Sequence, residues 1–323
     1  MIDTKKTRKL ILDIISKGKA AHIASCFSAV DILHAVYSSV DLGKIRDQAE
    51  DRDRVILSKG HAAASLYVTL FQFGFMKEAE LMTYHSDDSV LCGHVSHCVP
   101  GVEHSTGALG HGLPVALGMA IGLKARKLSS RVFVIVGDGE LHEGSNWEAI
   151  MLAGFRQLNN LCVLVDQNRL CQIGDIDKCC SLDSLKAKFE SFRFETYEVD
   201  EHNAKLIYQT ISSSKKSTKP VAIICQTTKG KGVSYMEGNN LWHYRTPTGR
   251  DYEQATTELL TFSILKHQWK VIYSGLFHSR KKVNTGFSNF FVETNTAFHK
   301  FDLEKACIWS TFDPLLEKRP IKA

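Results

Sequence analysis

The chain has 323 residues, of which 44% are hydrophobic and 23% are charged, a composition typical of one large or two modest globular α/β domains. The formal net charge of +5 comes without a nucleic-acid recognition motif, so we expect no nucleic-acid partner. No apolar run reaches the roughly 20 residues that a membrane-spanning helix needs, and the basic N-terminus lacks a signal-peptide cleavage pattern. We therefore expect a cytoplasmic protein with no membrane segment.

The nine cysteines are scattered, and an odd number in a chain of this length predicts reduced thiols rather than a disulfide framework. The adjacent pair Cys179 and Cys180 lacks the Cys-x-x-Cys spacing that is typical of zinc and redox sites. We therefore do not expect a structural zinc ion.

The N-terminal part of the chain predicts helices and one short strand. Apolar residues recur at helical spacing over 7–17 and 28–40, and Ser28 with Asp31 is typical of a helix N-cap. The segment VILSKGHAAASLYVTLFQFG predicts a short strand, a Ser-Lys-Gly-His turn and a helix of small residues. His61 lies in that turn, at the carboxyl end of the strand.

The middle of the chain predicts a parallel sheet. A loop-like segment from Met76 to His104 is followed by STGALGHG, which begins a helix of small residues. Strands are then expected at 131–136, 161–166, 192–200 and within 221–232, with helices at 146–157 and 203–214. Because RVFVIV and LCVLVD are continuous apolar runs, both faces of these strands should be covered.

This alternation predicts an α/β fold, a doubly wound, mostly parallel sheet flanked by helices. The alternation fades from about Tyr252. We therefore expect one domain at residues 1–251 and leave residues 252–323 as an unassigned C-terminal extension.

A carboxylate stands where the strand at 131–136 ends, in the stretch VIVGDGELHEG. Ligands of open parallel sheets bind at the carboxyl ends of strands, and the glycines beside Asp138 let backbone approach a phosphate. A carboxylate beside phosphate needs a cation between them. Asn168, which follows the next strand, and the carbonyl of Leu170 can complete an Mg²⁺ site together with a diphosphate. The alternative is an ordinary Asp-Gly turn.

The stretch from Gly137 to Asn168 resembles the fingerprint of thiamine diphosphate enzymes, in which Gly-Asp-Gly is followed at a distance by Asn. GDGxxxEGxxxEA is similar to the N-terminal, diphosphate-binding domain of transketolase, and the resemblance covers about residues 5–250. It implies the thiamin diphosphate-binding fold of the PP type, with thiamine diphosphate and Mg²⁺ as cofactors. It also implies a transferase that moves a two-carbon ketol unit between ketose and aldose sugars.

The resemblance extends to further cofactor contacts. His61 in SKGHAAASLY would contact the diphosphate, together with Gly139 and Glu140 of the GDG segment. In isolation, His61 could equally cap a helix. The stretch HSTGALGHG is similar to the family's TTGPLGQG. It implies that three consecutive residues line the thiazolium and aminopyrimidine rings: Gly107, Ala108 (in place of the usual proline) and Leu109.

Four histidines are expected to form a cluster around the reacting atoms. His22 and His94 correspond to family histidines that face the sugar hydroxyls, and TTKGKG followed by NNLWHYRTP makes His243 a histidine near the cofactor. With His61 they would donate hydrogen bonds and shuttle protons. Taken alone, each histidine could be structural, and TKGKG could be a solvated basic hairpin.

Glu143 and Glu148 match two glutamates that lie at the family's subunit interface and link two active sites by a proton path. An acidic helix start is the alternative explanation. One departure concerns the first histidine: AAHIASCFS replaces a Gly-His-Pro-Gly type of stretch, so Ala21, Ala24 and Ser25 add bulk where backbone usually approaches the ligand.

The resemblance also implies a partner chain. In this family a glutamate of a second, pyrimidine-binding domain activates the cofactor, and such a domain needs roughly 150 residues. We therefore expect the N-terminal subunit of a split transketolase, assembled as a heterotetramer or dimer of dimers and acting on small sugars. Two alternatives are a non-catalytic cofactor-binding or scaffolding subunit, and another thiamine diphosphate-dependent carboligase or decarboxylating synthase.

Overall fold

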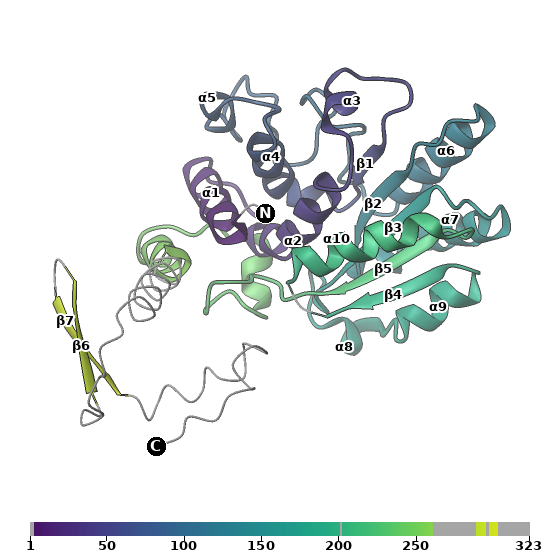
Figure 1. Ribbon diagram of the computed structural model, residues 1–323. Helices are drawn as coiled ribbons and strands as arrows, with labels where there is room; N and C mark the ends of the chain where they lie inside the picture. Colours follow the sequence, from purple (N-terminus) through teal and green to yellow (C-terminus); the bar gives the residue numbers. More distant parts are fainter. Residues whose placement is uncertain (1–2, 201, 261–288, 295–296, 303–323) are drawn as a thin grey trace, which may run out of the picture. The chain divides into compact units, whose positions relative to one another are not determined.

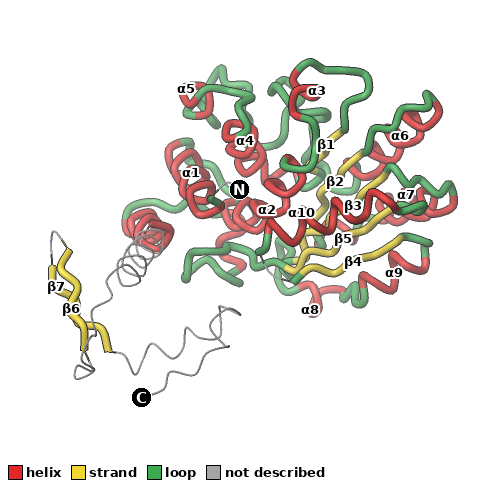
Figure 2. Tube along the Cα trace, viewed as in Figure 1, coloured by secondary structure: helices red, strands yellow, loops and turns green. Residues whose placement is uncertain are grey.

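The computed structural model of the protein describes residues 3–200, 202–260, 289–294 and 297–302, and its main feature is a parallel β-sheet between helices (Figures 1 and 2). The chain divides into two compact units, Met1–His267 and Gln268–Ala323. In the first unit the strands are β1 (Arg54–Leu57), β2 (Val132–Gly137), β3 (Leu161–Gln167), β4 (Glu195–Val199) and β5 (Val221–Gln226).

Helices connect these strands and cover them. Before the first strand come α1 (Thr4–Lys17), α2 (Ile23–Tyr37) and α3 (Leu42–Arg46). Between the strands lie α4 (Ala63–Gln72), α5 (Glu78–Leu81), α6 (Gly112–Ala125), α7 (Gly144–Phe155), α8 (Ile176–Cys180), α9 (Leu185–Ser191) and α10 (Ala204–Ser213). Short 3-10 turns are η1 (Gly60–Ala62), η2 (Gly139–His142), η3 (Ser214–Lys216) and η4 (Asn240–Tyr244).

The sheet has the strand order β1-β2-β3-β5-β4, and every neighbouring pair is parallel. Strand side chains alternate between two cores, as the pleat requires. Ile135, Leu164 and Ile223 pack in the core that contains α1, α2 and α4. Val134 and Val163 pack in the core that contains α6, α7 and α9. The continuous apolar runs therefore reflect burial on both faces, and the predicted fold class is confirmed.

The predicted start of the second helix is wrong. Helix α2 begins at Ile23 rather than at Ser28, and its N-cap is His22, whose φ of 66° lies in the left-handed region. Ser28 is buried within the helix and donates to Asp166, while Asp31 pairs with Arg8. Both polar side chains bind partners far away in the sequence, so they do not mark a helix start.

Other boundaries also differ from expectation. The segment expected as loop contains the short helix α5, and helices α8 and α9 lie between β3 and β4. Residues 250–260 are helical, and Ala255 and Leu259 belong to the core of the first unit. That unit therefore continues beyond the boundary expected at residue 251.

The second unit contains one described feature, an antiparallel pair of strands. These are β6 (Asn289–Thr294) and β7 (Ala297–Asp302). The aromatic residues of this region follow no clear period, so no element is expected there from the sequence. In the described residues, no helix combines the length and apolar character needed to span a membrane.

Candidate active site

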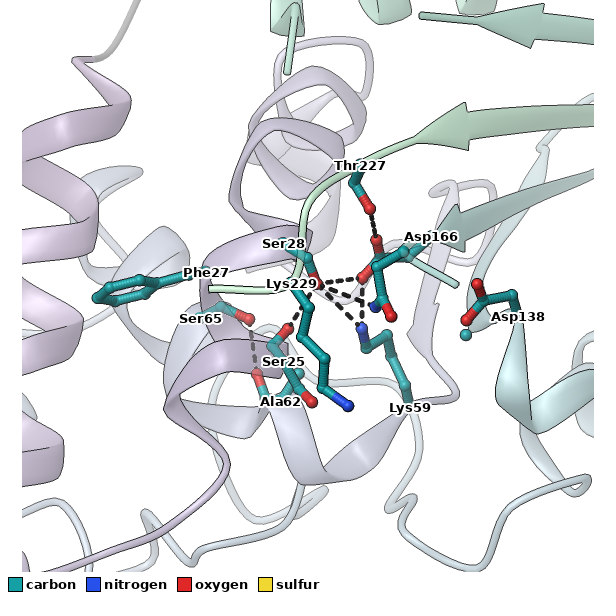
Figure 3. Close-up of polar contacts among 12 residues, drawn as sticks. Ser25, Phe27, Ser28, Lys59, Ala62, Ser65, Asp138, Asp166, Thr227 and Lys229 are labelled. Carbon is teal, nitrogen blue, oxygen red and sulfur yellow. Dashed lines mark hydrogen bonds and ion pairs between the residues drawn. The ribbon is translucent and has the colours of Figure 1, made fainter. Parts of the chain in front are cut away.

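Charged and polar side chains converge at the carboxyl ends of four strands in the first unit. Lys59 follows β1, Asp138 follows β2, Asp166 is the penultimate residue of β3, and Thr227 follows β5 (Figure 3). Parallel strands deliver their carboxyl ends to one edge of the sheet, which is where open α/β sheets bind ligands.

Asp138 is a buried carboxyl group held by backbone donors. Gly139 donates to Oδ1 over 2.8 Å, and Arg169 donates to Oδ2 over 2.5 Å. Burial raises the pKa of Asp138 to about 7, and the nearby charge of Asp166 adds to the shift. Because a buried carboxylate is costly without a cation, this environment favours a metal ion.

The other two expected metal ligands lie on either side of Arg169, whose backbone contacts Asp138. Oδ1 of Asn168 accepts a hydrogen bond from the backbone of Leu170 over 3.1 Å. The carbonyl of Leu170 accepts one from the Lys229 ammonium over 3.1 Å. All of these ligand atoms are oxygens, which suits Mg²⁺. In the described residues no cluster of three or more His, Cys, Asp or Glu could hold a metal alone, so a bound diphosphate would have to supply further ligands.

A buried ion pair, Lys59 with Asp166, supports this edge of the sheet (Figure 3). Ser28 donates to the same carboxylate over 2.6 Å, and Thr227 donates to its other oxygen. Although burial would raise the pKa of Asp166, Lys59 and these hydroxyls hold it below its usual value. Helix α2 and strands β1, β3 and β5 are therefore joined through one carboxylate.

The four predicted histidines come together. The ring centroid of His22 lies 5.3 Å from that of His61, 5.7 Å from that of His94 and 5.4 Å from that of His243. The exposed ring of Tyr244 meets His22 edge-on at 5.0 Å. The left-handed N-cap of α2 therefore presents His22 at the centre of a histidine cluster.

Three of these imidazoles are neutral at physiological pH. Burial lowers the pKa of His22 to about 4, with further effects from His94 and Lys229. Burial and Lys229 lower the pKa of His243 to about 3. Burial, followed by Lys59, lowers the pKa of His61 well below its usual value. Neutral rings can both donate and accept hydrogen bonds.

The glycine-containing turn at 106–110 packs against the histidines. A Cβ on Gly60 would lie 2.4 Å from the Thr106 carbonyl, so only glycine permits this contact with the His61 turn. Gly107 has a φ of 150°, and a Cβ there would lie 2.9 Å from the His94 ring. Ala108 is exposed and Leu109 is partly exposed, so both remain available to a ligand.

Gly139 and Glu140 pack against other residues of this chain. A Cβ on Gly139 would lie 3.1 Å from that of Cys171. The buried Glu140 carboxylate accepts from Ser58 over 2.5 Å and from the backbone of Gly110 over 3.1 Å. Its side chain therefore joins β1 and the turn before α6, which leaves its backbone for contact with a cofactor.

Of the two predicted interface glutamates, one directly precedes α7 and the other lies on it. Glu143 is the N-cap residue of this helix, without a side-chain cap bond, and both Glu143 and Glu148 are exposed. Exposure leaves them available to another chain.

Two of the three side chains that replace the family's smaller residues around His22 are buried in the core. Ala24 and Ser25 are buried in α2, and the Ala24 carbonyl accepts from the backbone of Gly230 over 3.0 Å. Ala21 is partly exposed.

Lys59, Asp166 and Lys229 were not predicted as site residues. Lys229 is buried, and its ammonium contacts Nδ1 of His243 over 2.8 Å as well as the Leu170 carbonyl. The solvated-hairpin interpretation of TKGKG is therefore wrong for Lys229. It holds better for Lys231, whose side chain is 40% exposed. The signal that could have found Lys229 is its place directly after an apolar strand, on the same edge as Asp138.

The fold and this edge define a protein of the thiamin diphosphate-binding fold. The transketolase of Campylobacter jejuni superposes with a TM-score of 0.69 at 25% identity, covering 86% of this chain and 48% of that one. The transketolase of Leishmania mexicana superposes with a TM-score of 0.66 at 24% identity, covering 86% and 48%.

The chain belongs to the transketolase family, because residues 2–270 match the family described as transketolase, thiamine diphosphate binding domain. It is 38% identical over 262 residues to an apulose-4-phosphate transketolase subunit of Phocaeicola vulgatus, covering 80% of this chain and 92% of the relative. It is 33% identical over 258 residues to a 6-deoxy-6-sulfo-D-fructose transketolase subunit of a Clostridium species, covering 78% and 93%.

The chain is shorter than undivided transketolases. It is 34% identical over 255 residues to human transketolase, covering 78% of this chain but 40% of that protein. It therefore corresponds to the N-terminal, thiamine diphosphate-binding part of a transketolase.

Proposed function

We propose that this chain is one subunit of a transketolase that transfers a two-carbon ketol unit from a ketose to an aldose, with thiamine diphosphate and Mg²⁺. The observation that carries the proposal is the cluster of four histidines beside the carboxyl edge that holds Asp138. A cluster of imidazoles that can donate and accept hydrogen bonds suits a substrate with several hydroxyls. A short keto acid lacks such a set of hydroxyls, which argues against a decarboxylating synthase.

Each site residue has a role in this proposal. Asp138, Asn168 and the Leu170 carbonyl would hold Mg²⁺, and His61, Lys229 and the backbone of Gly139 and Glu140 would hold the diphosphate. The neighbouring residues Gly107, Ala108 and Leu109 would line the rings. Thiamine diphosphate, when bound, supplies a carbon nucleophile and an electron sink.

The histidines would then orient the sugars and handle protons. His22 and His94 would bond sugar hydroxyls, and His243 would donate to or accept from the oxygen at the reacting carbon. Because burial keeps the pKa of His22 near 4 and that of His243 near 3, these rings would act as neutral donors and acceptors.

A partner chain is part of the proposal. Two relatives are named as transketolase subunits, and helix α7 exposes apolar side chains on its surface. Met151 is 55% exposed and Phe155 is 73% exposed, on the helix that carries Glu148. Exposed apolar side chains that gather on one helix are typical of an interface. We infer that α7 faces the chain that supplies the pyrimidine-binding domain and its activating glutamate, in a heterotetramer or dimer of dimers.

The relatives' names suggest which substrates to assay. They refer to ketoses that carry a phosphate or a sulfonate, so a ketose with an anionic end is our proposed donor. The eight cysteines in the described residues are free, which agrees with a reducing compartment, and we propose the cytoplasm.

A reconstitution assay tests the proposal. The chain is mixed with a pyrimidine-domain chain, thiamine diphosphate, Mg²⁺, a ketose phosphate or sulfonate, and an aldose phosphate. We expect ketol transfer that requires both chains, with kcat/KM lowered about 100-fold or more in His22→Ala and His94→Ala. Cofactor binding without transfer from any ketose donor would favour the scaffolding alternative, and consumption of pyruvate would favour a decarboxylating synthase.

A further inference from the structure

His202 lies between helix α2 and the loop that carries Lys229. Its side chain is 8% exposed, so the ring is almost wholly buried. Nδ1 lies 3.0 Å from Oδ2 of Asp31, and Nε2 lies 2.8 Å from the backbone nitrogen of Thr228. Both ring nitrogens therefore have a partner, one on α2 and one on the loop after β5.

Asp31 is ionised in this arrangement. It forms an ion pair with Arg8, and the two side chains are 3% and 4% exposed. Burial would raise the pKa of Asp31, but Arg8 and His202 together hold it below its usual value. Arg8 also donates to the Phe27 carbonyl through Nε and Nη2. The Asp31 carboxylate is thus a fixed acceptor, and it can bond His202 only if the ring donates.

The partners of His202 determine its tautomer. A backbone N–H can only donate, so Nε2 must be the unprotonated nitrogen that accepts from Thr228. The proton of a neutral ring then lies on Nδ1 and is donated to Asp31. Arg8 Nη2 lies 3.2 Å from the same Nδ1 because both groups donate to one carboxylate oxygen.

The loop that His202 contacts is anchored on both sides of Thr228. Before it, the backbone of Thr227 donates to the Gln167 carbonyl over 3.0 Å, and after it, Gly230 donates to the Ala24 carbonyl over 3.0 Å. Between these anchors, the Lys229 side chain reaches the Leu170 carbonyl and His243. The bond to His202 therefore fixes the peptide group between Thr227 and Thr228, which is one peptide group before the bond that joins Thr228 to Lys229.

We propose that His202 is a positioning residue: by accepting the Thr228 N–H it sets the direction of Lys229, and so the place of the Lys229 ammonium beside the diphosphate and metal ligands. The inference rests on the proposed function for the identity of the ligand. The geometry of His202 itself does not depend on that function.

The tautomer of His202 is the first test. In the ligand-free, ¹⁵N-histidine-labelled full chain at pH 8, long-range ¹H–¹⁵N correlation spectra distinguish the two ring nitrogens, with His202→Gln giving the assignment. We expect a proton on Nδ1 and none on Nε2. A proton on Nε2 overturns the proposal, because Thr228 would then have no acceptor on the ring.

Two substitutions provide the second test. The Oε1 atom of Gln can reach the position of Nε2 and accept from Thr228, whereas Asn is too short to do so. We expect His202→Asn to weaken binding of Mg²⁺–thiamine diphosphate by about tenfold or more, as is usual when a group that orients a ligand residue is lost. His202→Gln should remain within about threefold of wild type. Equal affinities for the two variants overturn the proposal.

His34→Asn is the matched control, because His34 is another buried histidine, on α2, and bonds Thr7 rather than the loop. We expect it to lower the midpoint of thermal unfolding and leave cofactor affinity unchanged. If His34→Asn weakens binding as much as His202→Asn, the effect is general destabilisation and the proposal is overturned. If wild type together with a pyrimidine-domain chain binds no Mg²⁺–thiamine diphosphate, the proposed function fails, while the tautomer measurement still decides the role of His202.

Discussion

Lys59 and Asp166 form an ion pair whose side chains are 2% and 0% exposed, at the edge of the sheet where Asp138 follows strand β2 (Figure 3). The ion pair connects the turn after β1 to the end of β3. Thr227, which follows β5, donates a hydrogen bond to the same Asp166 carboxylate. One buried carboxylate therefore holds together the loops that form the candidate site.

Removing one partner of this pair should destabilise the fold strongly. Asp166→Ala leaves the Lys59 ammonium buried without its counter-charge, so we expect the free energy of unfolding to fall by about 3–5 kcal/mol. The double variant Lys59→Met/Asp166→Leu removes both charges and should lose less than the single variant. Urea unfolding followed by circular dichroism measures both. A loss below about 1 kcal/mol in Asp166→Ala would contradict the structural role of the pair.

Lys229 should contribute to cofactor binding, whereas Lys231 should not. Burial, followed by the charge of Lys59, lowers the pKa of Lys229 to about 8, which shows that its charge lacks a full complement in the ligand-free chain. A diphosphate would supply that complement. We expect Lys229→Met to weaken thiamine diphosphate binding about 10- to 100-fold, measured by calorimetry with Mg²⁺.

Lys231, which is partly exposed and pairs with Glu237, provides the matched control. Lys231→Met should bind within about twofold of wild type, because a surface ion pair contributes little. Equal losses in the two variants would indicate a non-specific effect of charge.

His22 should make the fold less stable in acid. Its pKa is about 4 in the folded chain and about 6.5 when unfolded. Between these values the unfolded chain binds more protons, so stability is complete above about pH 6.5 and falls as the pH drops toward 4. Because the ring is partly exposed, we discount the full linkage value to about 1–2 kcal/mol.

The variant His22→Gln isolates this contribution. Its free energy of unfolding should depend less steeply on pH between 6.5 and 4 than that of wild type. Chemical unfolding at a series of pH values measures the slope, and parallel curves for the two proteins would show that His22 is not the titrating group.

Helix α7 should mediate association with another chain. Phe155→Glu places a charge on its exposed apolar surface and should weaken the complex with a pyrimidine-domain chain by about tenfold or more, as for a buried aromatic anchor. Leu206→Glu on α10 is the control, since Leu206 is also an exposed apolar residue. Analytical ultracentrifugation distinguishes the two, and equal weakening by both variants would remove the argument for α7.

Local pattern is enough to predict the sheet and the position of a carboxylate at its carboxyl edge. Continuous apolar runs predict β2 and β3, and the structure has both strands. The Gly-Asp-Gly motif predicts that Asp138 lies directly after β2, and it does. The resemblance to the transketolase family predicts the histidine cluster, and the structure places the rings of His61, His94 and His243 around that of His22. For the strands and Asp138, the information lies in adjacent residues.

Long-range pairing was what the sequence could not reveal. Ser28 has the composition of a helix cap, yet its hydroxyl bonds Asp166 from inside α2. Lys229 and Lys231 have similar neighbours in TKGKG, but Lys229 is buried and Lys231 is partly exposed. The partner of Ser28 and the burial of Lys229 both depend on which strands are neighbours in the sheet. Local sequence patterns do not predict the strand order β3-β5-β4.

The binding of Mg²⁺ and thiamine diphosphate through Asp138 is the central claim, and calorimetric titration of the full chain in complex with a pyrimidine-domain chain tests it most directly. Thiamine diphosphate is titrated into wild type, Asp138→Asn and the control Asp177→Asn, with and without Mg²⁺. The control removes a neighbouring, exposed carboxylate that pairs with Arg169. We predict Mg²⁺-dependent binding in wild type and Asp177→Asn, and its loss in Asp138→Asn. Undiminished Mg²⁺-dependent binding in Asp138→Asn would contradict the assignment.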